Sequence, residues 1–246
     1  MGQRRKAAPP TPSYATIHRA LRNLADPGVA SSSQRFFKTG PGEYGAGDRF
    51  LGIRVPQLRK LVREFQGATL PTTITLLQSA WHEERLLALL LLARRYQLGD
   101  AALRARIAKL YLAKRRYINN WDLVDSSAHL ILGPHLQHAD RRLLDRFARS
   151  RNLWERRIAV LTTFCYIRQR DHVDALRIAR QLVNDREDLI HKAVGWMLRE
   201  IGNRDPAVER SFLDAHAAHM PRTMLRYAIE KFPPRERMRY MKEISR

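Results

Sequence analysis

Trp121 and Asp125 are the two side chains whose types and spacing best suit chemistry. They are four residues apart, so a helix would place them on one face. The preceding Asn119 and Asn120 favour a helix start, which would put both within two turns of it, where the helix dipole favours an ionised Asp. The structural alternative is a core tryptophan with a dipole-compensating acid. Asp122 suits that alternative better, because it is nearer the helix start.

Two later segments repeat a tryptophan beside charged residues at helical spacing. Trp154 is followed three residues later by Arg157, and Trp196 is flanked by Lys192 and Arg199. Each alone is typical of core packing with a solvated charge. Aromatic side chains stack on sugars or bases, arginine binds phosphate, and a lone carboxylate stabilises a developing positive charge. Equivalent helices of a repeat array would bring four of these side chains to one cleft: Trp121, Asp125, Arg157 and Trp196.

The elements that would position these residues are helices. Apolar residues recur with the helical period along most of the chain, and start signals such as Pro56 divide it into helices of about 10–16 residues. Residues 84–90, 155–161 and 190–194 resemble one another, and a helix over 121–132 fills the intermediate position. A period of about 35 residues with two helices per unit indicates stacked helical repeats, with a plain helical bundle as the alternative. The sequence predicts an all-α solenoid with a concave basic groove.

The chain of 246 residues carries 45 Lys and Arg, most of them Arg, against 24 Asp and Glu, for a net charge of +21. So large an excess of cations indicates a polyanionic partner, and the arginine fork suits phosphate. General solubility is the weaker alternative. We expect a flexible basic tail over residues 1–12 and a single repeat domain over residues 13–246.

Cys165 is the one cysteine, so the sequence offers no disulfide framework. The longest apolar run, residues 86–93, is too short to span a bilayer, and residues 1–12 do not have the pattern of a secretory signal. A cytoplasmic protein is expected. The histidine pairs His135/His138 and His216/His219 lack further ligands, so no metal site is predicted.

A glycine-rich segment over residues 40–48 interrupts the helical pattern. It lacks the Lys-Ser/Thr ending of a phosphate-binding P-loop and follows no strand. We expect a shaped loop that displays Tyr44 and Arg49, and an inert connector is the alternative.

Four segments together resemble a known family. They are residues 50–56 (FLGIRVP), 120–125 (NWDLVD), 154–157 (WERR) and 192–200 (KAVGWMLRE). Over roughly residues 13–232 the chain resembles DNA alkylation repair proteins, and in particular AlkD-like alkylpurine DNA glycosylases built from HEAT-like repeats. The resemblance implies a HEAT-like repeat fold without cofactor or metal.

The resemblance also implies roles for single residues. Asp125 would be the catalytic carboxylate, Trp121 and Trp196 would pack on the deoxyribose of the damaged nucleotide, and Arg157 would hold a backbone phosphate. Tyr44 would correspond to a loop tyrosine at the lesion. We further predict DNA-backbone contacts from three cations: Lys192, Arg156 and Arg49.

The implied reaction is physically reasonable for a single acid. A purine alkylated at N3 or N7 is already positively charged, so it leaves without a general acid, and the sugar becomes an oxocarbenium cation. A fixed carboxylate stabilises that cation, whereas ordinary glycosidases need two carboxyl groups. Nothing indicates a Schiff-base lysine, so we expect a monofunctional enzyme with no strand-cutting step. The resemblance further implies that the lesion need not be flipped into a pocket, unlike in most base-modifying enzymes.

The predicted partner is double-stranded DNA that contains alkylated purines, bound by a monomer in the cytoplasm and associated with the nucleoid. One alternative is a non-catalytic repeat protein that binds distorted or branched DNA by shape and charge. Another is a protein-binding scaffold, against which the charge of +21 argues.

Overall fold

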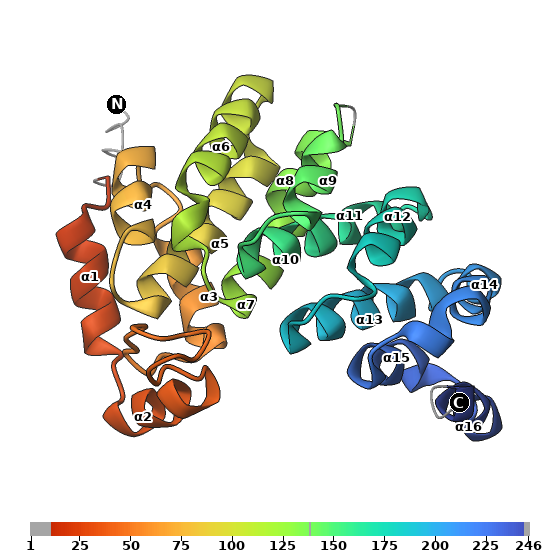
Figure 1. The fold of residues 1–246 in the computed structure, drawn as a ribbon. Helices are drawn as coiled ribbons and strands as arrows, with labels where there is room; N and C mark the ends of the chain where they lie inside the picture. The colour runs from red at the N-terminus through yellow and green to blue at the C-terminus, as the bar shows by residue number, and fades with distance from the viewer. Residues whose placement is uncertain (1–10, 138, 244–246) are drawn as a thin grey trace, which may run out of the picture. The chain divides into compact units, whose positions relative to one another are not determined.

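Helices make up the regular structure of the part of the chain that the computed structural model describes, residues 11–137 and 139–243 (Figure 1). The chain divides into two compact units, Met1–Leu98 and Gly99–Arg246. The first contains α1 (Tyr14–Asn23), α2 (Pro27–Phe36), α3 (Val55–Glu64), α4 (Leu70–Leu77) and α5 (His82–Leu98). The second contains α6 (Ala101–Lys114), η1 (Arg115–Tyr117), α7 (Trp121–Asp125), α8 (Ala128–Leu136), α9 (Arg142–Ala148), α10 (Leu153–Thr162), α11 (Phe164–Ile167), α12 (Val173–Leu182), α13 (Asp188–Gly202), α14 (Pro206–His216), η2 (Ala217–His219), α15 (Arg222–Ala228), η3 (Ile229–Lys231) and α16 (Pro234–Glu243).

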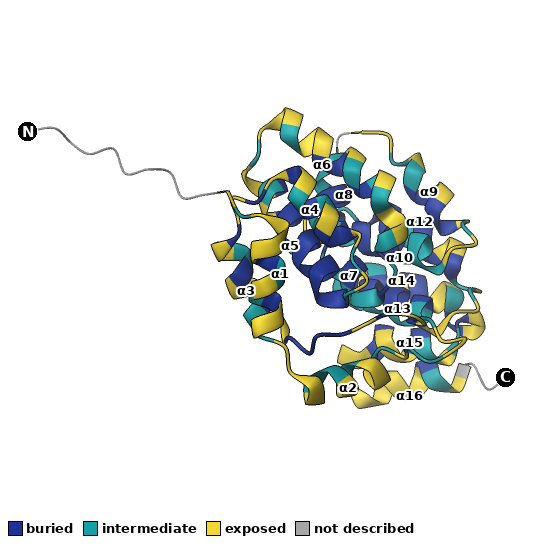
Figure 2. Cartoon of the chain, turned by 90° about the vertical axis from the view of Figure 1, so that its left-hand side faces the viewer, coloured by how far each residue is buried: buried dark blue, intermediate teal, exposed yellow. Residues whose placement is uncertain are grey.

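In the first unit, α5 forms the core. It packs against α3 and α4 and is buried on most of its faces, as its dark colour shows (Figure 2). Its first turn buries three charged residues, Glu83, Glu84 and Arg85, which therefore need partners inside the protein. Glu84 accepts a hydrogen bond from Tyr14 and pairs with His18, both on α1.

Glu83 organises the segment before α3. Its carboxylate accepts hydrogen bonds from the backbone N–H groups of Leu51, Gly52 and Ile53, at 2.9, 2.8 and 3.2 Å. Gly52 has φ +83°, and a Cβ there would lie 2.1 Å from the carbonyl oxygen of Asp26. The residues of segment 50–56 that precede α3 therefore form an irregular stretch, here called the strap, which lies against the start of α2.

The glycine-rich loop is anchored where it ends. Asp48 is buried and accepts a hydrogen bond of 2.6 Å from Arg85, and it lies 3.1 Å from the imidazole of His82. Gly42 and Gly47 adopt φ of +77° and +86°, which other residues rarely adopt. The loop therefore has a defined path that ends at Arg49.

In the second unit, helices pack mainly against others that are near them in the chain, such as α9 against α10 and α13 against α15 (Figure 1). The long helix α13 contacts α10, α12, α14 and α15. Its contact with α15 is so close that a Cβ at Gly195 would lie 2.4 Å from the carbonyl oxygen of Met224. This close approach explains the glycine before Trp196, because any larger residue would push α15 away.

These helices confirm the all-α, helical-repeat prediction. Pro56 lies in the first turn of α3, and Asn120 caps α7. The boundary between the two units falls at Gly99, inside the span predicted as one domain, and residues 1–10 of the predicted tail lie outside the described residues. No helix of the described residues is long and apolar enough to cross a membrane.

Candidate functional site

The predicted helix over 121–132 is two helices, and this changes the setting of Asp125. It breaks at Ser126 and Ser127, so that Asp125 is the last residue of the five-residue α7. The hydroxyl of Ser127 turns back onto the carbonyl oxygen of Leu123 at 2.5 Å and meets the buried Tyr111 hydroxyl at 3.0 Å. The prediction that the dipole of this helix stabilises the carboxylate is therefore wrong, because the C-terminal end of a helix disfavours negative charge.

Arg157 supplies the missing stabilisation. Its guanidinium donates two hydrogen bonds to Asp125, from Nε to Oδ1 at 2.8 Å and from Nη2 to Oδ2 at 2.7 Å. The side chain of Arg157 is 5% exposed and that of Asp125 is 16% exposed. Such two-point pairing is strong and fixes the plane of the carboxylate. The pair joins α7 to α10, and a further bond from Nη1 to the carbonyl of Leu189 extends it to α13.

The acidity of Asp125 reflects two opposed effects. Burial raises the pKa of the Asp125 carboxyl, and the neighbouring Asp122 adds to the rise. The charge of Arg157 and its hydrogen bonds lower the pKa, but burial is the larger effect, and the pKa of Asp125 is raised overall. The arginine is thus the group that favours the ionised form of an acid placed in a poorly hydrated site.

Trp121 begins the same short helix. Its backbone N–H donates to the Asn120 side chain at 2.8 Å, and Trp121 is half-buried. Because Trp121 and Asp125 are four apart on α7, they share a face. Both residues therefore border the surface where the Asp125 carboxylate is partly exposed.

Trp196 belongs to a row of aromatic rings that the sequence did not reveal. Its ring centroid lies 5.8 Å from that of Phe164, which lies 5.3 Å from the ring of His129. His129 follows Asp125 by four residues. The row therefore links α13, through α11, to the start of α8 next to Asp125.

Two further contacts define this row. The indole N–H of Trp196 donates to Glu200 at 3.2 Å, which orients the ring. Burial and the nearby Arg168 lower the pKa of His129 to about 4, so the imidazole is neutral at pH 7. Phe164 and His129 carried no signal in the sequence, since aromatic residues at helical spacing also fill cores.

The predicted backbone contacts on α10 and α13 already have protein partners. Arg156 lies 2.7 Å from the Asp185 carboxylate and donates to the carbonyls of Ser150 and Arg151. Lys192 pairs with Asp188 at 2.7 Å. A phosphate would have to compete with these bonds, and the DNA contacts of both cations stay predictions.

Tyr44 and Arg49 belong to the first unit. The Tyr44 hydroxyl donates to the carbonyl of Phe36 at 3.5 Å, and its side chain is half-buried. Arg49 is exposed, with its guanidinium carbon 4.4 Å from the centre of the Trp81 ring, and Arg22 lies over the same ring at 4.7 Å. Two cations thus gather on one indole, which the sequence did not predict.

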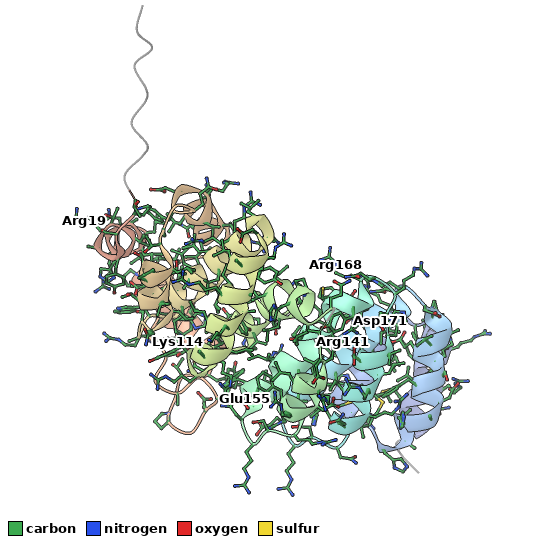
Figure 3. All side chains as sticks on the ribbon, turned by 90° about the horizontal axis from the view of Figure 1, so that it is seen from above. Arg19, Lys114, Arg141, Glu155, Arg168 and Asp171 are labelled. Atoms are coloured by element: carbon green, nitrogen blue, oxygen red, sulfur yellow. The ribbon has the colours of Figure 1, made fainter. Side chains whose placement is uncertain are left out.

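Many other arginines of the second unit neutralise acids. Arg141 donates to Asp171 at 2.9 Å (both labelled in Figure 3) and to Asp174 at 2.5 Å, and its guanidinium lies over the ring of Tyr166. Arg115 pairs with Glu155 at 2.6 Å. Across the described residues, no group of three His, Cys, Asp or Glu is placed to hold a metal ion, and His138 lies outside them.

The fold and the charge define a class of protein: a strongly basic, all-helical repeat protein with a buried acid–arginine pair that joins two of its helices. Residues 17–232 match the sequence profile of a family described as "DNA alkylation repair enzyme". Because the match covers most of the chain, this protein belongs to that family. Its role is accordingly in DNA alkylation repair, with DNA as the partner.

A solved structure shares the fold. A chain titled "Predicted DNA alkylation repair enzyme from Enterococcus faecalis" superposes with a TM-score of 0.66 at 16% sequence identity. The similarity covers 86% of this chain and 98% of that one. None of the curated proteins compared with the chain matches it.

Proposed function

We propose that this protein is a DNA glycosylase that hydrolyses the N-glycosidic bond of purines alkylated at N3 or N7 in duplex DNA. The observation that carries the proposal is the setting of Asp125. It is an acid held in a fixed orientation by Arg157, partly exposed, at the end of the helix that carries Trp121.

The proposed chemistry needs one negative charge at the sugar. An alkylated purine leaves as a neutral base, and the electron pair of the glycosidic bond goes with it. The sugar is left as an oxocarbenium cation, which water attacks, and the added water then loses a proton to the solvent. The Asp125 carboxylate stabilises the cation, and its fixed orientation means that it need not reorganise as the charge develops. Trp121 and Trp196 would provide apolar walls for the deoxyribose.

Arg157 connects the acid to the DNA backbone in this proposal. A guanidinium has five N–H groups, and the bonds to Asp125 and Leu189 use three of them. The remaining two would bind a phosphate next to the lesion. A bound phosphate would partly neutralise the positive charge of Arg157. More of the negative charge of Asp125 would then act on the sugar cation. Tyr44 would contact the lesion, and Arg49, Arg156 and Lys192 the backbone.

The test is the release of free bases. Methylated duplex DNA is incubated with the protein, and free 3-methyl- and 7-methylpurines are measured by chromatography. We expect release by the wild type and a loss of about 100- to 1,000-fold in Asp125→Asn, because one preorganised electrostatic group is removed. Asp122→Asn is the matched control, since it removes the same charge from the same helix and should keep most of the rate.

Binding of unmodified DNA should be unchanged in both variants. Equal background release by the wild type and Asp125→Asn would reject the glycosylase and favour a repeat protein that binds altered DNA without excision.

A further inference from the structure

A basic hollow lies at the C-terminal end of the second unit. It has a volume of about 750 Å³ and is lined by residues of α13, α15, η3 and α16. Figure 1 shows α13, α15 and α16 near one another. Its charged lining consists of two acids, Asp188 and Glu230, and four cations: Lys192, Arg222, Arg226 and Arg237. Arg237 lies on α16, which begins after the end of the family match at residue 232.

Both acids of the hollow are already neutralised. Burial opposes the ionisation of Asp188, but hydrogen bonds from Lys192 and Thr223 outweigh it and lower the pKa of Asp188. Glu230 pairs with Arg199. Lys192 therefore neutralises Asp188, and Arg199 neutralises Glu230. Neither acid neutralises the other three cations of the lining.

Arg222, Arg226 and Arg237 are exposed, and their side chains form no hydrogen bond or ion pair within the described part of the chain. They differ in this from their neighbours Arg199, Arg204 and Arg210, which bind Glu230, Glu200 and Glu236. Three cations around one concave surface raise the local potential and concentrate anions. The planar, multidentate guanidinium suits phosphate oxygens in particular.

The hollow adjoins the face that carries Trp196. Asp188, Lys192 and Trp196 follow one another at intervals of four on α13, so they share one face, with about 6 Å between successive positions. The close contact at Gly195 fixes α15 against this helix. The backbone of α15, which carries Arg222 and Arg226, is therefore held against the helix that carries Trp196.

We propose that this hollow binds consecutive phosphates of a DNA strand, next to the nucleotide that packs on Trp196. The inference rests on the proposed binding of duplex DNA but not on base excision. It places the C-terminal helix α16, beyond the matched family region, in the DNA interface through Arg237.

The test is the salt dependence of binding. Affinity for an unmodified duplex is measured by fluorescence anisotropy at several salt concentrations, for the wild type, Arg237→Gln and the triple variant Arg222→Gln/Arg226→Gln/Arg237→Gln. Each lost phosphate contact reduces the slope of log K against log salt by about 0.9. We expect a reduction of about 1 for the single variant and about 3 for the triple variant. Melting temperatures should not change, because these side chains have no hydrogen-bond or ion-pair partner to lose in the part of the chain that the structure describes.

Arg235→Gln is the matched control. Arg235 is exposed on the same helix, two residues from Arg237, and does not line the hollow. Its slope should equal that of the wild type. Equal slopes for the wild type and the triple variant would overturn this inference and leave the glycosylase proposal intact. A wild type that does not bind duplex DNA would overturn both. Reduced slopes without base release would support the hollow and reject the glycosylase.

Discussion

Asp125 and Arg157 form a coupled unit, because neither charge is well hydrated without the other. Burying an ion is unfavourable unless a partner compensates it, and removing one member of such a pair strands the other. Both oxygens of Asp125 accept bonds from this one guanidinium. The charge of the acid at neutral pH therefore depends on the arginine.

Loss of Arg157 should move the pH dependence of base release. Burial raises the pKa of Asp125 and Arg157 lowers it, so Arg157→Gln raises it further. On acidification, Arg157→Gln should therefore lose activity at a higher pH than the wild type. Its rate should recover as the pH increases. Arg157→Lys keeps a cation and should shift the profile less. Single-turnover base release between about pH 5 and pH 9 measures this, and superimposable profiles for Arg157→Gln and the wild type would contradict it.

At the scale of elements, close backbone approaches position the helices. Gly52 lets the strap before α3 lie against α2, and Gly195 lets α15 lie against α13. Gly47 has a similar positive φ but nothing within 4 Å of where its Cβ would be. Comparing Gly52 with Gly47 therefore separates the effect of backbone strain on stability from the effect of the steric contact.

Gly52→Ala should destabilise the protein more than Gly47→Ala. Both substitutions place a side chain in an unfavourable backbone region, at a cost of about 1–3 kcal/mol. At Gly52 the new Cβ also meets the carbonyl of Asp26, so the strap or α2 must move. Thermal unfolding followed by circular dichroism compares the variants, and equal melting temperatures would show that the close approach contributes nothing.

Glu209 on α14 makes the packing of α14 against α13 sensitive to pH. Its side chain lies against Gly202, it is 2% exposed, and its Oε1 has no hydrogen-bond partner in the described residues. Burial raises the pKa of Glu209 to about 8, whereas a solvent-exposed glutamic acid has a pKa of 4.5. The folded state therefore binds a proton that the unfolded state has released between these values.

Wild-type stability should consequently fall as the pH rises from about 5 to about 8, since the raised pKa favours folding only while Glu209 is protonated. Glu209→Gln stays neutral and should remove this component, with a gain of a few kcal/mol above pH 8. Urea denaturation at pH 5, 7 and 9 tests this. A variant with the same pH dependence as the wild type would exclude Glu209 as the cause.

For the whole molecule, the net charge of +21 predicts the mode of DNA binding. Contacts to phosphate do not depend on base sequence, and they release counterions, so affinity falls as salt increases. We expect duplexes of different sequence to bind alike. Affinity should fall at least about tenfold between 50 and 200 mM salt, as anisotropy titrations would measure. Affinity that is constant over this range would exclude backbone charge as its source.

The limits of local spacing appear at α7. Asn120 marks its start in the sequence, because a capping side chain acts on its own neighbours. Its end after Asp125 carries no comparable signal. Ser127 bonds back to Leu123 and also meets Tyr111, and the second of these contacts comes from another helix.

The residues of the site were predictable to different degrees. Trp121 and Asp125 follow from spacing on one helix, Arg157 and Trp196 from similar spacing in later repeats, and the family resemblance supplied their roles. The pairing of Arg157 with Asp125 and the ring contacts of Phe164 with His129 and Trp196 join residues 32 to 35 positions apart in sequence. Helical periodicity says which face a residue occupies but not which side chain on another helix it meets.

The sequence by itself determined the helical class, the starts of many helices and the excess positive charge, because periodicity, capping and composition are local or additive properties. Only the tertiary structure decided that Asp125 ends its helix, that Arg157 rather than a helix dipole stabilises its charge, and that three arginines around one hollow have no side-chain partner among the described residues. These outcomes depend on how separate helices pack, and packing is a property of many distant residues at once.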